Sequence, residues 1–130
     1  MALHTTHYIG NAGEFLAASF IARVADQALI TSQGIADIIF EYEAKFYRCQ
    51  VKTKSQQEIH RINWRFDSRR SKAKDRTYPD NTIDIYALVS LERRNAVFIA
   101  DHKEKQITIG EEHMKNNDAV KNLLDILNNK

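Results

Sequence analysis

Apolar residues near the N-terminus recur at the spacing of an α-helix. Three of them follow one another every fourth residue: Leu16, Phe20 and Val24. Alanines fill much of the space between them, so the pattern predicts a helix over residues 10–25 with one apolar face. Asn11 precedes Glu14 by three residues, which is the spacing of a capping box, so we expect the helix to begin at Asn11.

After this helix the pattern changes to short apolar runs separated by turn residues. The runs predicted to be strands are 28–31, 35–42, 46–53, 83–91 and 96–100, with a short edge strand at 107–109. A turn at 43–45 joins two of them, so residues 35–53 are expected to form a β-hairpin. The almost continuous apolar run 83–91 is typical of a buried strand. Asp118 is placed to cap a final helix carrying Val120, Leu123, Leu124 and Leu127.

The order of these elements predicts one α/β (α+β) domain over residues 1–130, with a central mixed β-sheet flanked by helices. Residues 54–82 are polar, contain the only proline, and are expected to form a long flexible loop with a short strand near 62–66. A loop of that length in a compact domain is usually functional or disordered.

Composition excludes several classes of protein. The single cysteine, Cys49, rules out an intramolecular disulfide and a cysteine-rich zinc site, and it favours a reducing compartment. No apolar run is long enough to span a membrane, and the N-terminus lacks the pattern of a signal peptide. We therefore expect an intracellular protein, in the cytoplasm or nucleoid of a prokaryote or encoded by a phage, with no membrane partner.

The net charge of +2 hides a strongly uneven distribution of charge. Residues 45–76 contain eleven basic and three acidic residues, a local charge of +8, whereas the remainder of the chain carries −6. Such a basic stretch is typical of a surface that binds a polyanion. The candidate DNA-binding residues are Lys54, Arg61, Trp64, Arg65, Arg69, Arg70, Lys72, Lys74 and Arg76. Trp64 could stack on a base, although a place in the core is the alternative.

Candidate chemistry gathers on the predicted hairpin. Asp37 lies early in its first strand, and Gln50 and Lys52 lie on the second strand, where alternation puts them on one face and Val51 on the other. A carboxylate, an amide oxygen and a backbone carbonyl are ligands for Mg²⁺, and a lysine can neutralise charge on a phosphate. Glu14 could reach a metal, or it could only close the capping box.

These residues carry a resemblance to a known family. Glu14, the segment G-I-A-D ending in Asp37, and C-Q-V-K ending in Lys52 resemble the PD-(D/E)XK nuclease superfamily over roughly residues 8–100. Within it the pattern is most similar to the small intron-encoded homing endonucleases of bacteria. The resemblance implies a restriction-endonuclease-like core, cleavage of double-stranded DNA, and Mg²⁺ as cofactor, with Mn²⁺ able to substitute. The implied catalytic residues are Glu14, Asp37, Gln50 and Lys52, and the implied metal ligands are Glu14, Asp37, Gln50 and the carbonyl of Val51.

The sequence departs from the family pattern at two positions. Ala36 stands where the family has proline, which is not a ligand, and Gln50 stands where most members have a carboxylate. We interpret Gln50 as an active variant. Asp84 is expected to begin a strand, and Cys49, which alternates with Gln50, to lie in the core.

Three functions therefore compete. The leading hypothesis is a metal-dependent DNA endonuclease of the homing type. A structure-selective nuclease similar to Holliday junction resolvases is the nearest alternative, and a DNA-binding module with a decayed site is the third. Because both strands of a duplex must be cut, we expect a homodimer or a higher homo-oligomer, with the final helix as a candidate interface.

Overall fold

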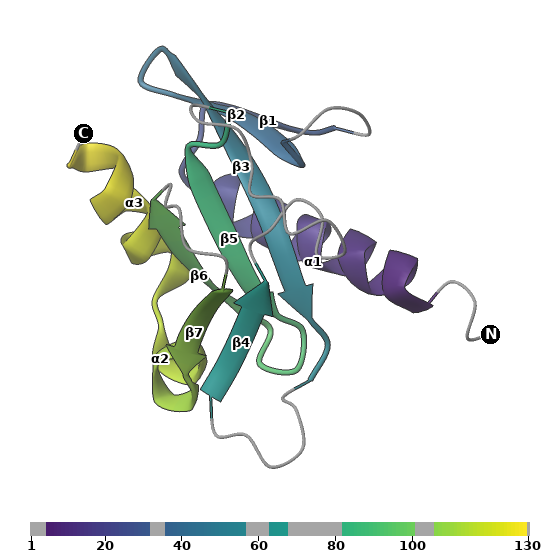
Figure 1. Cartoon of the computed structure of the whole chain (residues 1–130). Helices are drawn as coiled ribbons and strands as arrows, with labels where there is room; N and C mark the ends of the chain where they lie inside the picture. Colours follow the sequence, from purple (N-terminus) through teal and green to yellow (C-terminus); the bar gives the residue numbers. More distant parts are fainter. Residues whose placement is uncertain (1–4, 32–35, 57–62, 68–81, 101–105, 130) are drawn as a thin grey trace.

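The protein is described by a computed structural model that covers residues 5–31, 36–56, 63–67, 82–100 and 106–129. A five-stranded mixed sheet in the order β1-β2-β3-β5-β6 forms its centre (Figure 1). Helices α1 and α3 pack on one face of this sheet, and the two-stranded sheet β4–β7 with helix α2 packs on the other. The elements are α1 (Thr5–Ile21), β1 (Gln27–Ile30), β2 (Ile38–Tyr42), β3 (Lys45–Lys54), β4 (Asn63–Asp67), β5 (Ile85–Ser90), β6 (Asn95–Ala100), β7 (Gln106–Gly110), α2 (Glu111–Asn116) and α3 (Ala119–Asn128). The predicted α+β class with a central mixed sheet is confirmed.

Helix α1 begins earlier than the sequence pattern predicted. It starts at Thr5, so Asn11 lies inside the helix and cannot be its N-cap. The predicted capping box of Asn11 and Glu14 is therefore wrong. Glu14 lies in the middle of the helix, where its carboxylate has no helix end to cap. The capping role that competed with a functional role for Glu14 is therefore excluded.

The predicted hairpin is present as β2 and β3. The two strands pair antiparallel with Phe40 opposite Tyr47, and the turn between them is made by Glu43 and Ala44. Both turn residues have positive φ, 50° and 66°, the backbone twist that joins two strands through a tight two-residue turn. Residues 32–35, which the sequence assigned partly to the first strand, lie outside the described part of the chain.

Strand β5 brings the distant half of the chain against the hairpin. It pairs parallel with β3, with Gln50 opposite Tyr86 and Lys52 opposite Leu88, and all six of its residues are buried. The apolar run that predicted a buried strand is explained by this central position, because both faces of β5 are covered.

Two hydrophobic cores lie on opposite faces of the central sheet. The first packs α1 and α3 against residues such as Cys49 and Val51 of β3, and the second packs β4, β7 and α2 against Tyr86 and Leu88 of β5. Cys49 is fully buried in the first core, as alternation predicted. Gln50 and Lys52, whose partners Tyr86 and Leu88 belong to the second core, lie on the opposite face.

Two features of the C-terminal half differ from the prediction. Strand β7 does not extend the central sheet but pairs with β4 to form a separate small sheet. Helix α2 is a short element that the sequence pattern did not predict. Asp118 caps α3 as expected, accepting a hydrogen bond from the backbone N–H of Lys121, and Leu123 and Leu127 of α3 are buried in the first core.

Among the helices of the described residues, none has the length and the apolar character that crossing a membrane requires.

Candidate active site

The site lies where β2 and β3 separate. Strand β2 begins at Ile38, opposite Cys49, but β3 continues for five residues beyond that pair to Lys54. This second half of β3 therefore has β5 on one side and no β2 residue on the other. Because β2 does not pair with this part of β3, side chains from both faces of the sheet can reach the free edge of the strand. Asp37 marks the start of the opening, immediately before β2.

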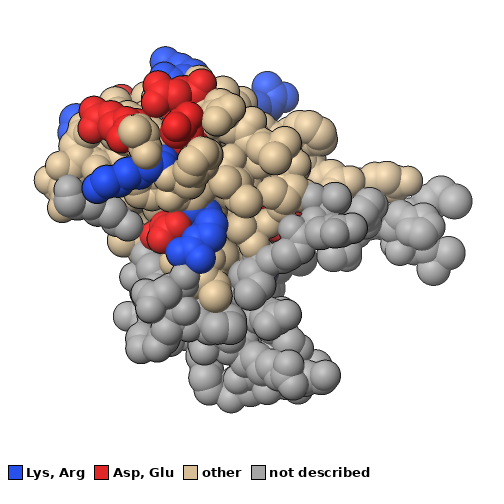
Figure 2. All heavy atoms as spheres, turned by 90° about the horizontal axis from the view of Figure 1, so that it is seen from above, with Lys and Arg blue, Asp and Glu red and all other residues tan. Residues whose placement is uncertain are grey.

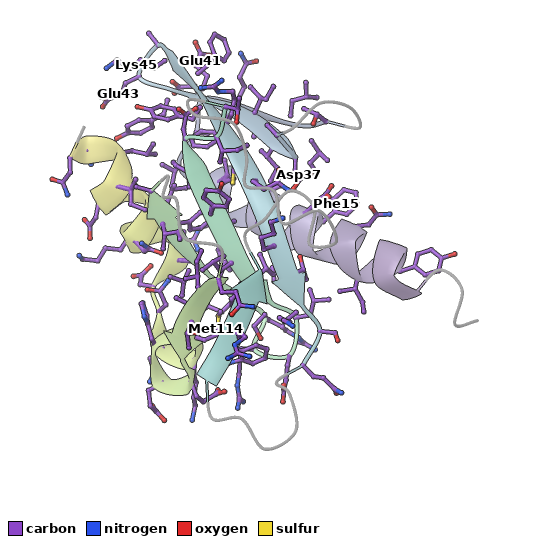
Figure 3. The ribbon with its side chains drawn as sticks, viewed as in Figure 1. Phe15, Asp37, Glu41, Glu43, Lys45 and Met114 are labelled. Atoms are coloured by element: carbon purple, nitrogen blue, oxygen red, sulfur yellow. The ribbon has the colours of Figure 1, made fainter. Side chains whose placement is uncertain are left out.

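Two hydrogen bonds with the backbone of β3 hold Asp37 at this opening. Its N–H donates to the carbonyl of Cys49 at 2.9 Å, and its carboxylate Oδ2 accepts from the N–H of Val51, also at 2.9 Å. The carboxylate thus takes the place of the strand residue that would otherwise pair with Val51. Figure 3 labels Asp37 beside the part of β3 where β2 begins. The sequence placed Asp37 inside the strand, whereas the structure places it one residue before the strand.

Gln50 presents a buried oxygen with no bonding partner. The residue is 8% exposed, and no donor in the described ranges lies within hydrogen-bonding distance of its Oε1. A buried amide oxygen without a partner is unfavourable by about 1–3 kcal/mol, so it usually indicates a group that binds something else. Gln50 lies on β3 between Cys49 and Val51, the two residues whose backbone groups bond Asp37. Gln50 and Asp37 therefore lie at neighbouring positions of the sheet.

Lys52 and the Val51 carbonyl complete the β3 side of the site. The ammonium of Lys52 lies close enough to Asp37 for its positive charge to lower the pKa of that carboxyl. Within a strand the N–H and C=O of one residue point to the same side, so the Val51 carbonyl is directed to the side where its N–H meets Asp37. Asp37, Val51 and Lys52 thus lie close together, and Gln50 lies beside Val51 on the same strand.

Glu14 approaches the same opening from the helix that covers the other face. Partial burial and, to a smaller extent, the negative charge of Asp37 raise the pKa of the Glu14 carboxyl. Burial likewise raises the pKa of Asp37, against the lowering effects of the Val51 N–H and Lys52. Two carboxylates that disfavour each other's ionisation form a site that a cation would stabilise.

Cys49 responds to the same local charge. Complete burial raises the pKa of its thiol, and the nearby negative charge of Asp37 raises it further. The thiol therefore stays protonated and unreactive at neutral pH. Its place is in the core and not in the chemistry of the site.

The residues present fit a divalent cation that prefers oxygen ligands. In the described segments no three His, Cys, Asp or Glu side chains are grouped to hold a metal, so a site built only of those types is absent there. The candidate oxygen donors here are instead the carboxylates of Asp37 and Glu14, the amide oxygen of Gln50 and the Val51 carbonyl. Hard oxygen donors of mixed charge suit Mg²⁺ or Mn²⁺ better than zinc.

The substitution Gln50→Glu tests this donor set. It would add a third negative charge beside Asp37 and Glu14, so we expect a lower Tm in EDTA at pH 8 and about tenfold tighter binding of Mn²⁺. Differential scanning calorimetry and titration calorimetry measure the two effects. The matched control is Gln56→Glu, which adds the same charge at an exposed position. Equal effects of the two substitutions would contradict a metal site at Gln50.

Asp84 has a structural partner. Its carboxylate Oδ2 accepts from the backbone N–H of Arg48 at 2.8 Å and from the Arg48 Nε at 3.2 Å. The Asp84 N–H in turn donates to the Arg48 carbonyl, so the start of β5 is fixed to β3 at this point. Asp84 therefore lies directly before β5, whereas the sequence predicted that it begins the strand itself. Its carboxylate also neutralises part of the positive charge of the basic segment by pairing with Arg48.

The structure describes three of the predicted DNA-binding residues. Lys54 ends β3, with its side chain half-buried, and Arg65 of β4 is exposed. The others lie outside the described residues: Arg61, Arg69, Arg70, Lys72, Lys74 and Arg76. On the face shown in Figure 2, acidic and basic side chains of the described residues alternate without forming one basic surface.

Trp64 requires a correction. It is 1% exposed in the second core, and its indole Nε1 donates to Glu111 Oε2 at 2.9 Å. Strand β4 alternates, so Trp64 and Phe66 face the core while Arg65 faces solvent. With its ring covered on both sides, Trp64 cannot stack on a base, and the alternative that the sequence left open, a core position, is the one observed.

Replacing Trp64 by phenylalanine tests this assignment. Trp64→Phe removes the bond to Glu111 and leaves a small cavity, so we expect a loss of about 2–3 kcal/mol in the free energy of unfolding. Affinity for duplex DNA, measured by fluorescence anisotropy at fixed salt, is expected to change by less than about twofold. Unchanged stability together with weakened DNA binding would show that the ring contacts DNA after all.

Sequence reasoning gave no role to Gly13, the residue before Glu14. It is buried, and a Cβ atom built on it would lie 1.9 Å from Thr53 Oγ1. A glycine inside an amphipathic helix, directly before a candidate acidic residue, was a signal of close approach that could have been used.

Comparison with known proteins shows a likeness in fold. No family model and no curated protein matches the sequence. Among solved structures, a bacterial homing endonuclease, I-Ssp6803I, has a similar fold, with a TM-score of 0.65 over 82% of this chain and 76% of that chain. The sequence identity is 18%, so the likeness establishes a shared fold.

Proposed function

We propose that the protein is a metal-dependent DNA endonuclease of the PD-(D/E)XK class, similar to homing endonucleases. The observation that carries the proposal is the buried Gln50 Oε1, which has no partner among the described residues and belongs to the β3 residue between the two that bond Asp37. Lys52 stands two residues further on the same face of β3. The fold shared with a bacterial homing endonuclease supports the same function.

Asp37 and Gln50 would hold Mg²⁺ or Mn²⁺, with the Val51 carbonyl and Glu14 as further oxygen donors. A divalent cation bound there supplies a Lewis acid that polarises the phosphodiester and acidifies a coordinated water. The N–H of Val51 fixes the orientation of the Asp37 carboxylate, and β5 fixes the position of β3. The protein side of the site is thus largely formed before any ligand binds.

Lys52 would supply a further positive charge beside that of the cation. Its ammonium is close to Asp37 and lies on the face of β3 opposite the first core. There it would neutralise charge that develops on the phosphate and orient the attacking water. Glu14, whose pKa is raised, would accept a proton or a water bond at the opposite side of the opening.

DNA would be held by the basic segment 45–76, which carries a local charge of +8. Lys54 and Arg65 are the described members that we propose to contact phosphates, because Arg65 is exposed and Lys54 lies at the end of β3, two residues beyond Lys52. Binding through several phosphates predicts a steep loss of affinity with salt.

We further propose that the enzyme acts as a homo-oligomer, because each chain offers one site and a duplex has two strands. Helix α3 is a weaker candidate for the interface than the sequence suggested, since Leu123 and Leu127 are buried in the first core. Large apolar side chains are instead exposed elsewhere in the described residues: Tyr8, Phe15, Leu29 and Phe46.

The test is cleavage of defined DNA substrates by the purified protein. A randomised linear duplex library, a supercoiled plasmid and a four-way junction are incubated in Mg²⁺, Mn²⁺ or EDTA, and the cut ends are sequenced. The proposal predicts metal-dependent cuts enriched at one duplex sequence. Preferential cutting of the junction without sequence preference would indicate a resolvase, and binding without cutting in any metal would contradict the proposal.

A further inference from the structure

Helix α1 and strand β3 are in close contact at Gly13 and Thr53. A Cβ atom added to Gly13 would lie 1.9 Å from Oγ1, 2.7 Å from Cβ and 2.7 Å from Cγ2 of Thr53. Separations under 3.0 Å are essentially never seen for a real Cβ. Since the Cβ of Thr53 is itself too close, no rotation of the threonine side chain makes room. Any side chain at position 13 would therefore force the helix away from the strand.

This contact joins the direct sequence neighbours of two residues of the proposed site. Gly13 immediately precedes Glu14 on α1, and Thr53 immediately follows Lys52 on β3. Asp37 is fixed to β3 by the bond from Val51 N–H, so β3 and Asp37 move together. A displacement of α1 from β3 would accordingly move Glu14 away from Asp37 by a similar distance.

We infer that Gly13 is a positioning residue, whose lack of a side chain lets α1 pack on Thr53 and so sets how closely Glu14 approaches Asp37. The inference rests on the proposed function for its catalytic consequence, but the geometric part does not depend on it. Glycine weakens the interior of a helix relative to alanine, so its presence here is explained by the contact and not by helix formation. Site groups in enzymes must be held to within about 0.5 Å of their working positions, and a displaced helix exceeds that.

Gly10 provides a matched control on the same helix. Nothing lies within 4 Å of the position that its Cβ would take. Gly10→Ala and Gly13→Ala therefore make the same chemical change, three residues apart, and differ only in the contact with Thr53.

The first experiment is a crystal structure of each variant. Gly13→Ala is expected to show α1 shifted from β3 and a wider separation of the Glu14 and Asp37 carboxylates, whereas Gly10→Ala is expected to leave both unchanged. An unaltered Glu14–Asp37 separation in Gly13→Ala would overturn the inference whether or not the protein cuts DNA. A wider separation in a protein without nuclease activity would uphold the inference and reject the proposed function.

The second experiment measures the consequence. Gly13→Ala is expected to bind Mn²⁺ about tenfold more weakly by calorimetry and to cut DNA about 100-fold more slowly at saturating Mg²⁺. Gly10→Ala is expected to equal the wild type in both. Wild-type Mn²⁺ affinity and rate in a folded Gly13→Ala protein would overturn the inference.

A compensating substitution guards against a variant that fails to fold. Thr53→Gly removes all three atoms that a Cβ at position 13 would meet. The double variant Gly13→Ala, Thr53→Gly is expected to match Thr53→Gly alone in Mn²⁺ affinity and cleavage rate, to within about threefold. If the double variant folds but keeps the defect of Gly13→Ala, the contact with Thr53 is not what positions Glu14.

Discussion

Asp37→Asn is expected to reduce DNA cleavage by at least about 10³-fold while raising the Tm of the metal-free protein at pH 8. Asparagine retains an oxygen that can accept the bond from Val51 N–H, so the local backbone is preserved. It loses the negative charge that holds a cation. Loss of activity with a gain of stability is the combination expected when a site is strained for function.

The direction of the stability change follows from the pKa of Asp37. Burial raises that pKa in the folded protein above its ordinary value, so the folded state binds more protons than the unfolded state between the two values. Stability therefore falls as pH rises through this window and stays lower above it. At pH 8 the ionised carboxylate disfavours folding, and asparagine removes that cost. Glu14 acts in the same direction through its own raised pKa.

Thermal unfolding in EDTA at pH 4 and pH 8, with cleavage assays in Mg²⁺, measures both effects of Asp37→Asn. The matched control is Asp84→Asn, the same change at a carboxylate that bonds Arg48. That control is expected to lower Tm and to leave the rate at saturating DNA nearly unchanged. A destabilised Asp37→Asn protein that still cuts DNA would show that Asp37 is a structural residue.

Lys52→Met is expected to reduce the cleavage rate at saturating DNA by about 10²–10⁴-fold and to change DNA affinity by less than about threefold. Methionine keeps most of the length and volume of the lysine side chain but has no charge to neutralise the phosphate. Single-turnover cleavage and fluorescence anisotropy separate the two quantities. Measuring the cleavage rate and the DNA affinity separately distinguishes an enzyme from a DNA-binding module with a decayed site.

Lys54→Met is the control for Lys52→Met. Lys54 lies on the same strand and the same face, two residues nearer the end. We expect it to weaken DNA binding, to reduce the salt dependence by about one phosphate contact, and to preserve the rate at saturating DNA. If Lys52→Met instead weakens binding and preserves that rate, Lys52 serves only to hold the phosphate backbone.

The central part of the fold could be predicted because its signals are local. Strand alternation placed Cys49 and Val51 on one face and Gln50 and Lys52 on the other, and the structure confirms both faces. The buried strand β5 was evident from its continuous apolar run. That it pairs parallel with β3 depends on packing between distant segments, which no local pattern specifies.

Trp64 shows how a charge pattern can mislead. Its neighbours along the chain are basic, which suggested a role in DNA binding, yet the alternation of the segment 63–67 already grouped Trp64 with Phe66 and apart from Arg65. The structure follows the alternation, with both aromatic rings 1% exposed. In a strand, the side to which a residue points is a stronger indication of its role than the charge of adjacent residues.

The position of Glu14 could be only partly predicted. Its spacing from Asn11 fitted a capping box, but α1 extends six residues further towards the N-terminus, so the spacing had no structural meaning. What brings Glu14 to Asp37 is the close packing of α1 on β3 at Gly13 and Thr53. A contact between residues forty positions apart leaves no periodic signal in a single sequence.

The most direct test of the site is anomalous diffraction from a crystal of the protein grown with Mn²⁺. The account predicts a Mn²⁺ peak about 2.0–2.3 Å from both a carboxylate oxygen of Asp37 and Oε1 of Gln50. The same crystal form of Asp37→Asn is predicted to lack the peak. A Gln50 Oε1 that instead accepts a protein hydrogen bond, with Mn²⁺ bound elsewhere, would contradict the central claim that this opening in the sheet is a metal site.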